Sequence, residues 1–202
     1  FLPHKFIDHT HADAVLTLTN QPGGEGLIKE LYGNKVAIVP YVMPGFALAK
    51  LCADIYDQNP QVEAMVLLKH GVFTFGETAK ESYDRMITVV SAAEEAVAKS
   101  SPSSKTPELK VSEDLAGWWM TAIRSELQRR GAPAVLKRNS SHAALAFCGR
   151  DDLSNLATRG PLTPDHIIRT KQFPLVMSAA AVERKDPEAL NQALDSFEKS
   201  YR

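Results

Sequence analysis

The sequence predicts an α/β fold, and three observations support this prediction. Strand-like runs alternate with helix-like runs through the first half of the chain. The clearest amphipathic pattern extends from Ala79 to Lys99, where apolar residues recur at helical spacing and predict a helix that packs on a sheet. With 202 residues, 44% of them hydrophobic, the chain is long enough to bury a sizeable core.

The elements of the N-terminal half follow from periodicity and from turn residues. KFIDHTH at 5–11 is typical of a strand, and prolines near the start and beyond the end of 44–60 indicate a helix between them. The β-rich run 62–76 is broken at His70 and Gly71, where a turn or bulge would return the chain as a second strand. The other expected elements are helices at 12–20 and 26–33, a buried strand at 36–41, and the helix that Glu77 or Thr78 opens.

A change in composition divides the chain. Residues 99–110, KSSPSSKTPELK, are rich in serine, proline and lysine without periodicity, which is typical of a linker or an exposed loop. We therefore expect a metal-binding core at 1–99, a linker or loop at 100–112 and a C-terminal α/β part at 113–202. The expected C-terminal elements are a helix around Trp118 and Trp119, strands at 133–138 and near 143–149, a helix near 151–157, and a final helix from Pro187 to Tyr201.

Charge and cysteine content limit the classes of partner. The 23 basic and 24 acidic residues give a net charge of -1, which predicts no general attraction to nucleic acid or to an anionic membrane. No apolar run approaches the roughly eighteen residues of a membrane span, and no secretory signal pattern opens the chain. Cys52 and Cys148 form no disulfide framework, so we expect free thiols and a cytoplasmic location.

His9 and His11 are the first candidate metal ligands. Residues two apart in a strand point to the same side, with Cα atoms about 6.5 Å apart, so two imidazoles can converge on one ion. Asp13, at the start of the next segment, is a candidate for orienting one of these rings. The alternative is that His9 and His11 are two ordinary polar strand residues.

His70 provides a third ligand. It ends the apolar run AMVLL and precedes Gly71, a residue that permits a sharp turn. Three imidazoles with an open fourth position are typical of a catalytic zinc-type site, because structural zinc sites usually contain cysteine. Such an ion can stabilise an enolate that develops beside a carbonyl.

The order of motifs resembles that of the class II aldolase/adducin family. DHTHADA is followed by VPYVMPG and then by LLKHGVFTFGET with a long amphipathic helix. LATRGPLTPDHIIRTK, further along, resembles more narrowly the aldolase half of bifunctional rhamnulose-phosphate aldolase/lactaldehyde dehydrogenase-type proteins. The resemblance spans most of residues 1–175 and implies a layered fold in which helices flank a mainly antiparallel sheet.

The resemblance implies a function and a set of ligands. His9, His11 and His70 correspond to the family's three ligands for one divalent ion, usually zinc. Family members cleave a ketose phosphate reversibly, through an enediolate, into dihydroxyacetone phosphate and an aldehyde, which would be lactaldehyde for the narrower relatives. A homo-oligomer, commonly a tetramer, is implied as well.

The same resemblance shows what this chain lacks. The family's catalytic glutamate falls upstream of Phe1, so no catalytic residue is assigned and the fragment itself is expected to be inactive if that part is needed. The dehydrogenase half would follow Arg202. We therefore interpret the chain as an internal piece of a longer protein.

Two other functions remain open, as do several individual residues. The same metal chemistry serves sugar-phosphate epimerases of this family, and an adducin-like interaction module would keep the fold without catalysis. Tyr41 could donate a proton or simply pack, and Glu77 could act as a base or cap a helix. In the segment TRGPLTPDHIIRTK, arginines near a helix start could hold a phosphate, whereas the preferred interpretation is that Thr163 and Asp165 cap this helix.

Overall fold

The computed structural model describes residues 2–100 and 109–201, and these form two compact units. The first unit contains residues 2–100 together with Pro161–Gln172, and the second contains residues 109–160 and 173–201. Most of the expected linker at 100–112 lies outside the described residues.

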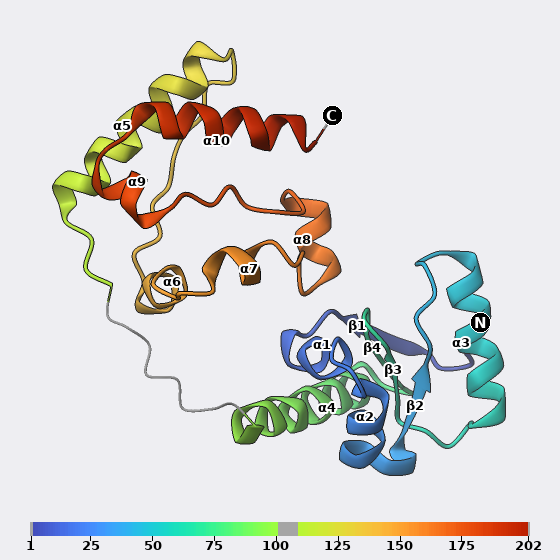
Figure 1. Ribbon diagram of the computed structural model, residues 1–202. Helices are drawn as coiled ribbons and strands as arrows, with labels where there is room; N and C mark the ends of the chain where they lie inside the picture. The colour runs from blue at the N-terminus through green and yellow to red at the C-terminus, as the bar shows by residue number, and fades with distance from the viewer. Residues whose placement is uncertain (1, 101–108, 202) are drawn as a thin grey trace. The chain divides into compact units, whose positions relative to one another are not determined.

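A four-stranded sheet in the order β1-β4-β3-β2 forms the centre of the first unit (Figure 1). β4 pairs antiparallel with both β1 and β3, whereas β2 pairs parallel with β3. The expectation of a mainly antiparallel sheet flanked by helices is therefore confirmed. The strands are β1 (Phe6–Thr10), β2 (Val36–Val39), β3 (Ala64–Leu67) and β4 (Gly71–Gly76).

Helices cover both faces of this sheet because alternate residues of the buried strands point to opposite sides. Ala64 and Val66 of β3 pack into a cluster with residues of α1, α2 and α4. Met65 and Leu67 point the other way, into a cluster with residues of α3. The helices of this unit are α1 (Asp13–Thr19), α2 (Gly24–Tyr32), the short 3-10 helix η1 (Gly33–Lys35), α3 (Phe46–Gln58), α4 (Ala79–Ser100) and α8 (Pro164–Arg169).

The long helix α4 confirms the strongest sequence pattern. Met86, Val89 and Ala93 are buried against the sheet. At its start, the backbone N–H of Glu81 donates to Oγ1 of Thr78 at 3.1 Å, which satisfies one of the free amides of the first turn.

The second unit consists of helices and loops in its described residues (Figure 1). Trp119 is buried, and its indole N–H donates to the carbonyl of Val182 at 2.9 Å. Leu190, also buried, comes from the last helix. The helices are α5 (Glu113–Arg129), α6 (His142–Cys148), α7 (Leu153–Ala157), α9 (Ala179–Glu183) and α10 (Pro187–Lys199).

Two strands predicted for the C-terminal part are wrong. Residues 133–138 are irregular, and Val135 is 100% exposed, so this run buries no apolar face that a strand would need. The run near 143–149 is helix α6, in which alanines favour the helix and Oγ of Ser141 accepts a hydrogen bond from the N–H of Ala144 at 3.3 Å. The described part of 113–202 is therefore helical rather than α/β.

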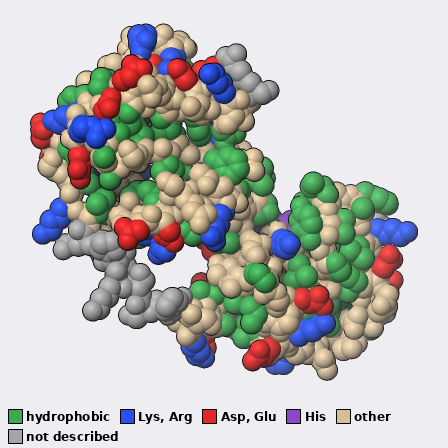
Figure 2. Space-filling model, viewed as in Figure 1, with side chains coloured by type: hydrophobic (Ala, Val, Ile, Leu, Met, Phe, Trp, Pro, Cys, Tyr) green, Lys and Arg blue, Asp and Glu red, His purple; other side chains and the backbone are tan. Residues whose placement is uncertain are grey.

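Basic and acidic side chains are interspersed on the face shown in Figure 2, in keeping with the net charge of -1. Cys52 and Cys148 are free thiols, buried and exposed respectively. Among the described residues, the helices are all too short or too polar to cross a membrane.

Candidate metal centre

His9 lies on edge strand β1, and its ring is oriented by the neighbouring strand. It is the register partner of Phe73 on β4, and the two rings pack with centroids 4.3 Å apart. Nδ1 of His9 lies 2.9 Å from the carbonyl oxygen of Val72, which can only accept a hydrogen bond. Nδ1 therefore carries the proton, and the Nε2 lone pair of the neutral ring is free to bind a ligand.

His11 lies just beyond β1 and has the same tautomer for a different reason. Its Nδ1 donates to Oδ2 of Asp165 at 2.8 Å. The Nε2 atoms of His9 and His11 face each other at 3.0 Å. Because both Nδ1 protons are already donated, two lone pairs meet at this point when both rings are neutral, and a shared cation would relieve their repulsion.

His70 approaches from the turn between β3 and β4. This turn needs a left-handed residue, Lys69, whose φ is 61°. The side chain of His70 is almost fully buried, and its Nδ1 is a buried nitrogen without a hydrogen-bond partner. A buried polar atom of this kind is costly unless a ligand occupies the neighbouring space.

Gly71 provides the room in which the three rings meet. A Cβ at this position would lie 2.4 Å from the carbonyl oxygen of Thr10 and 3.1 Å from ring carbons of both His9 and His11. A side chain here would therefore push β4 away from β1 or displace the imidazoles.

The three imidazoles form a nearly regular triangle. Ring centroids are 4.8 Å apart for His9 and His11, 5.2 Å for His9 and His70, and 5.1 Å for His11 and His70. One ligand nitrogen from each ring lies within 4.8 Å of the others. Three imidazole nitrogens that converge in this way fit a divalent cation of the zinc type.

The local environment keeps two of these rings neutral. Desolvation lowers the pKa of His9, and the nearby His11 lowers it further, against opposing contributions from the Val72 carbonyl and Asp165. Burial lowers the pKa of His70, with further lowering by His9 and His11. Since only the neutral imidazole binds a metal, both shifts favour occupancy at neutral pH.

The residue that orients His11 was not predicted from the sequence. Asp13, the sequence candidate, is exposed in the first turn of α1, and Asp165 makes the contact instead. The hydrogen bond from His11 lowers the pKa of Asp165, which therefore stays ionised. Thr163 is the N-cap residue of α8, as predicted, but its hydroxyl pairs with Nδ1 of His166 at 2.7 Å and does not accept from a backbone amide of the first turn.

Other sequence candidates lie elsewhere. Glu77 is exposed and pairs with Nδ1 of His4 at 3.3 Å, whose Nε2 lies 2.7 Å from the hydroxyl of Tyr56. Tyr41 is 52% exposed in the loop after β2. Two arginines were considered for an anion site. Nε of Arg169 lies 4.0 Å from Oδ1 of Asp165 in the first unit. Arg159 belongs to the second unit.

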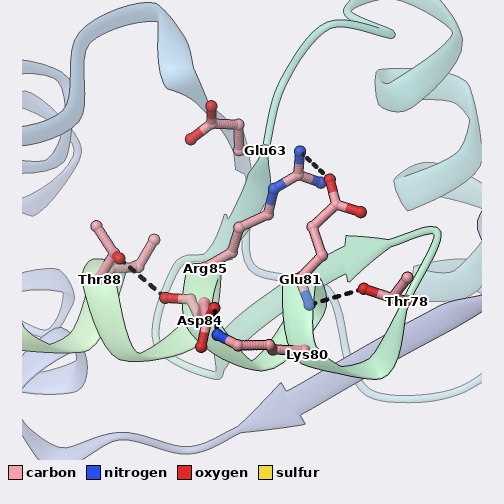
Figure 3. Close-up of a pocket in the computed structure, with 8 residues that line it drawn as sticks. Glu63, Thr78, Lys80, Glu81, Asp84, Arg85 and Thr88 are labelled. Atoms are coloured by element: carbon pink, nitrogen blue, oxygen red, sulfur yellow. Dashed lines mark hydrogen bonds and ion pairs between the residues drawn. The ribbon is translucent and has the colours of Figure 1, made fainter.

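A cavity of about 450 Å³ near the start of α4 is a separate feature (Figure 3). Four of the charged groups drawn there pair with one another: Arg85 pairs with Glu81 at 2.8 Å, and Lys80 pairs with Asp84. These are helix-stabilising pairs of the i,i+4 type. The cavity is lined by Glu63, Thr78, Lys80, Glu81, Asp84, Arg85, Thr88 and Val89, so it includes none of the three histidines.

Comparison with known proteins identifies the family of this chain. Residues 1–97 match the model of the class II aldolase and adducin N-terminal domain, and residues 115–202 match the model of the second domain of class II aldolase. The chain belongs to the class II aldolase/adducin family. The class II aldolase fold expected from the sequence is confirmed.

Individual relatives extend the comparison. The uncharacterized oxidoreductase YuxG of Bacillus subtilis (strain 168) is 32% identical over 184 residues, which cover 87% of this chain and 26% of that relative, so the chain spans about a quarter of its length. The N-terminal class II aldolase domain of a conserved protein from Thermoplasma acidophilum is 44% identical, with a TM-score of 0.43 over 48% of this chain and 44% of that one. An aldolase II superfamily protein from Pseudomonas syringae is 18% identical, with a TM-score of 0.39 over 62% of this chain and 56% of that one.

Proposed function

We propose that this chain is the metal-binding part of a class II aldolase, a carbon–carbon lyase that cleaves a ketose phosphate reversibly to dihydroxyacetone phosphate and an aldehyde. The observation that carries the proposal is the convergence of His9, His11 and His70, with a buried unpartnered nitrogen on His70. A rhamnulose phosphate that yields lactaldehyde is the substrate we favour, because the resemblance that includes LATRGPLTPDHIIRTK points to it.

The residues of the chain have definable roles in this chemistry. His9, His11 and His70 would hold one divalent ion, zinc by preference, since three imidazoles leave an open position for substrate oxygens. When bound, that ion supplies positive charge that stabilises the enediolate. Val72 and Asp165 hold the Nδ1 protons of His9 and His11, which keeps both Nε2 atoms available.

The relative from Bacillus subtilis supports a further part of the proposal. Its name describes an oxidoreductase, and this chain matches only 26% of it. We propose that the aldolase region works beside an oxidoreductase region in the parent protein, which could act on the released aldehyde. Assembly as a homotetramer, implied by the family resemblance, is likewise a proposal that light scattering on the parent protein would test.

Metal content per chain is the first test. Elemental analysis of the wild type, purified without chelator, is expected to give about one equivalent of divalent metal. His70→Ala should lose it, whereas His142→Ala, a matched change of an exposed histidine in the second unit, should retain it. Metal absent from the wild type, or equally retained in His70→Ala, would contradict the proposed centre.

The reaction itself is tested on the full-length parent protein. Rhamnulose phosphate and related ketose phosphates are incubated with enzyme, and dihydroxyacetone phosphate is measured by a coupled reductase. Its release supports the aldolase; conversion of substrate to an epimer without release would favour the epimerase instead. A protein that binds no metal and turns over none of these substrates would favour an adducin-like interaction module.

A further inference from the structure

The segment Pro161–Gln172 lies far along the chain from the histidines but belongs to the same compact unit. We propose that Asp165, carried by this segment, is a positioning residue that fixes the tautomer and the ring orientation of His11 for metal binding. The segment is thereby part of the metal centre. This inference rests on the proposed metal-binding function and gives Asp165, which the sequence pattern indicated only as a helix cap, a role at the metal centre.

The contact between the two side chains is short and well placed. Oδ2 of Asp165 lies 2.8 Å from Nδ1 of His11, and the two side chains are 45% and 20% exposed respectively. An ionised carboxylate only accepts hydrogen bonds, so the proton must be on Nδ1. In the neutral form of the ring, which is the form that binds a metal, the lone pair of His11 is then on Nε2, the atom that faces Nε2 of His9 at 3.0 Å.

Without this carboxylate, two properties of His11 would change. The ring could place its proton on Nε2, where it would block the lone pair needed for a metal, and it could rotate away from His9. Carboxylate partners of metal-bound histidines commonly contribute about 10- to 100-fold to metal affinity for these reasons. The equivalent partner of His9 is the carbonyl of Val72, which a substitution cannot remove.

Other contacts hold the segment in place independently of His11. Nδ2 of Asn20 donates to the carbonyl of Leu162 at 3.0 Å, and Thr163 is buried. Asn20 follows the last residue of α1, whereas His11 lies shortly before its first residue. The segment is thus anchored near the C-terminal end of α1 by a contact that does not involve His11, which helps to present the carboxylate to His11 before any metal arrives.

Cobalt binding provides the test, because Co²⁺ in a histidine site has visible absorption that reports both affinity and geometry. Asp165→Ala is expected to weaken Co²⁺ binding by about 10- to 100-fold. Asp165→Asn should lie between Asp165→Ala and the wild type, since the amide oxygen can still accept from Nδ1. The matched control is Asp13→Asn, which also removes an acid from the first turn of a helix and should bind within about twofold of the wild type.

A second measurement separates this inference from the proposed function. In the metal-free chain, long-range ¹H–¹⁵N spectra of the imidazoles should show His11 with its proton on Nδ1, and Asp165→Ala should shift the ring toward the other tautomer. Unchanged tautomer and unchanged Co²⁺ affinity in Asp165→Ala would overturn the positioning role, as would an equal loss in Asp13→Asn. If the wild type binds no Co²⁺, the proposed function fails, and the tautomer result alone decides whether Asp165 orients His11. Should Asp165→Ala fail to fold, the near-isosteric Asp165→Asn is measured in its place. A Co²⁺ affinity and a tautomer equal to those of the wild type would then overturn the positioning role.

Discussion

The backbone N–H of Lys69 donates to Oγ1 of Thr19 at 3.2 Å. This hydrogen bond connects the turn that carries His70 to the last residue of α1. Thr19 is buried, so no water replaces its hydroxyl readily. The turn is also closed by its own backbone, since the N–H of His70 donates to the carbonyl of Leu67 at 3.1 Å. The position of the third histidine thus depends on a side chain that lies fifty residues before Lys69 in the chain.

We expect Thr19→Val to destabilise the protein by about 1 to 2 kcal/mol, because it keeps the shape of the side chain but leaves the amide of Lys69 unpaired. Metal affinity should also fall, since His70 is no longer held. Urea unfolding and Co²⁺ titration measure the two effects. Thr17→Val is the matched control: its hydroxyl bonds only the carbonyl of Asp13 within α1, so a loss as large as that of Thr19→Val would contradict the role given to the turn.

Gly71→Ala is expected to destabilise the first unit by about 1 to 3 kcal/mol and to abolish tight metal binding. The added methyl group would overlap the carbonyl oxygen of Thr10, a backbone atom that cannot move without parting β1 from β4. Thermal unfolding and metal content provide the readings.

The control for this change is Gly26→Ala in α2, where a Cβ meets nothing within 4 Å. Replacing an exposed helical glycine by alanine should stabilise the protein by about 0.5 to 1 kcal/mol. We expect the free energy of unfolding to fall in Gly71→Ala and to rise in Gly26→Ala. A Gly71→Ala variant as stable as the wild type would show that the fold does not require the close approach of β1 and β4.

We expect the stability of the protein to depend on alkaline pH through Tyr32. Its hydroxyl donates to the carbonyl of Val89 at 2.7 Å, and burial raises its pKa to about 12. Because the folded state holds the phenol proton more tightly than the unfolded state does, this contribution to stability is complete below about pH 10 and is lost as the pH rises toward 12. Tyr32→Phe should cost about 0.5 to 1.5 kcal/mol at neutral pH and show a shallower loss of stability between pH 10 and 12. If the stability of the wild type and of Tyr32→Phe fell in parallel between pH 10 and 12, the loss could not be assigned to ionisation of Tyr32.

Local sequence patterns were enough to identify all three histidines as candidate ligands, and strand geometry predicted that two of them lie side by side. His9 and His11 share one side of the chain because a strand repeats every two residues, and this holds even though His11 lies one residue past β1. His70 was found from its place before Gly71, where the turn was expected. These features depend on neighbours within a few residues, which is the range that periodicity and turn chemistry describe.

Asp165 could not be found in this way, because its contact with His11 joins residues 154 positions apart. The local pattern Thr163-Pro164-Asp165 indicated a helix start, and α8 does begin at Pro164. The pattern carried no information about where that helix would dock. The wrong strands at 133–138 and 143–149 have a related cause: short apolar runs suit a strand or a helix, and tertiary partners decide between them.

We expect the stability of the second unit to depend on acid pH through Glu126. Its buried carboxylate accepts from Nε of Arg130 at 2.6 Å and also pairs with Arg129, while Arg130 reaches Asp195 of α10 at 2.8 Å. Burial alone would raise the pKa of Glu126, but the hydrogen bonds from Arg130 and Arg129 outweigh it and lower the pKa.

Glu126→Gln should therefore lower the thermal midpoint at neutral pH, because it removes the negative charge that pairs with Arg130 while keeping the size of the side chain. A group with a depressed pKa in the folded state stabilises the protein above its unfolded pKa, and this contribution is lost as the pH falls through the folded value. The difference in midpoint between wild type and Glu126→Gln should thus be largest near pH 7 and shrink on acidification below about pH 4.5. Calorimetry across this range measures it, with the exposed Glu183→Gln of α9 as the control that should follow the wild type. A difference that stays constant to pH 3 would mean that the glutamate stabilises the junction of α5 and α10 by its shape and not by its charge.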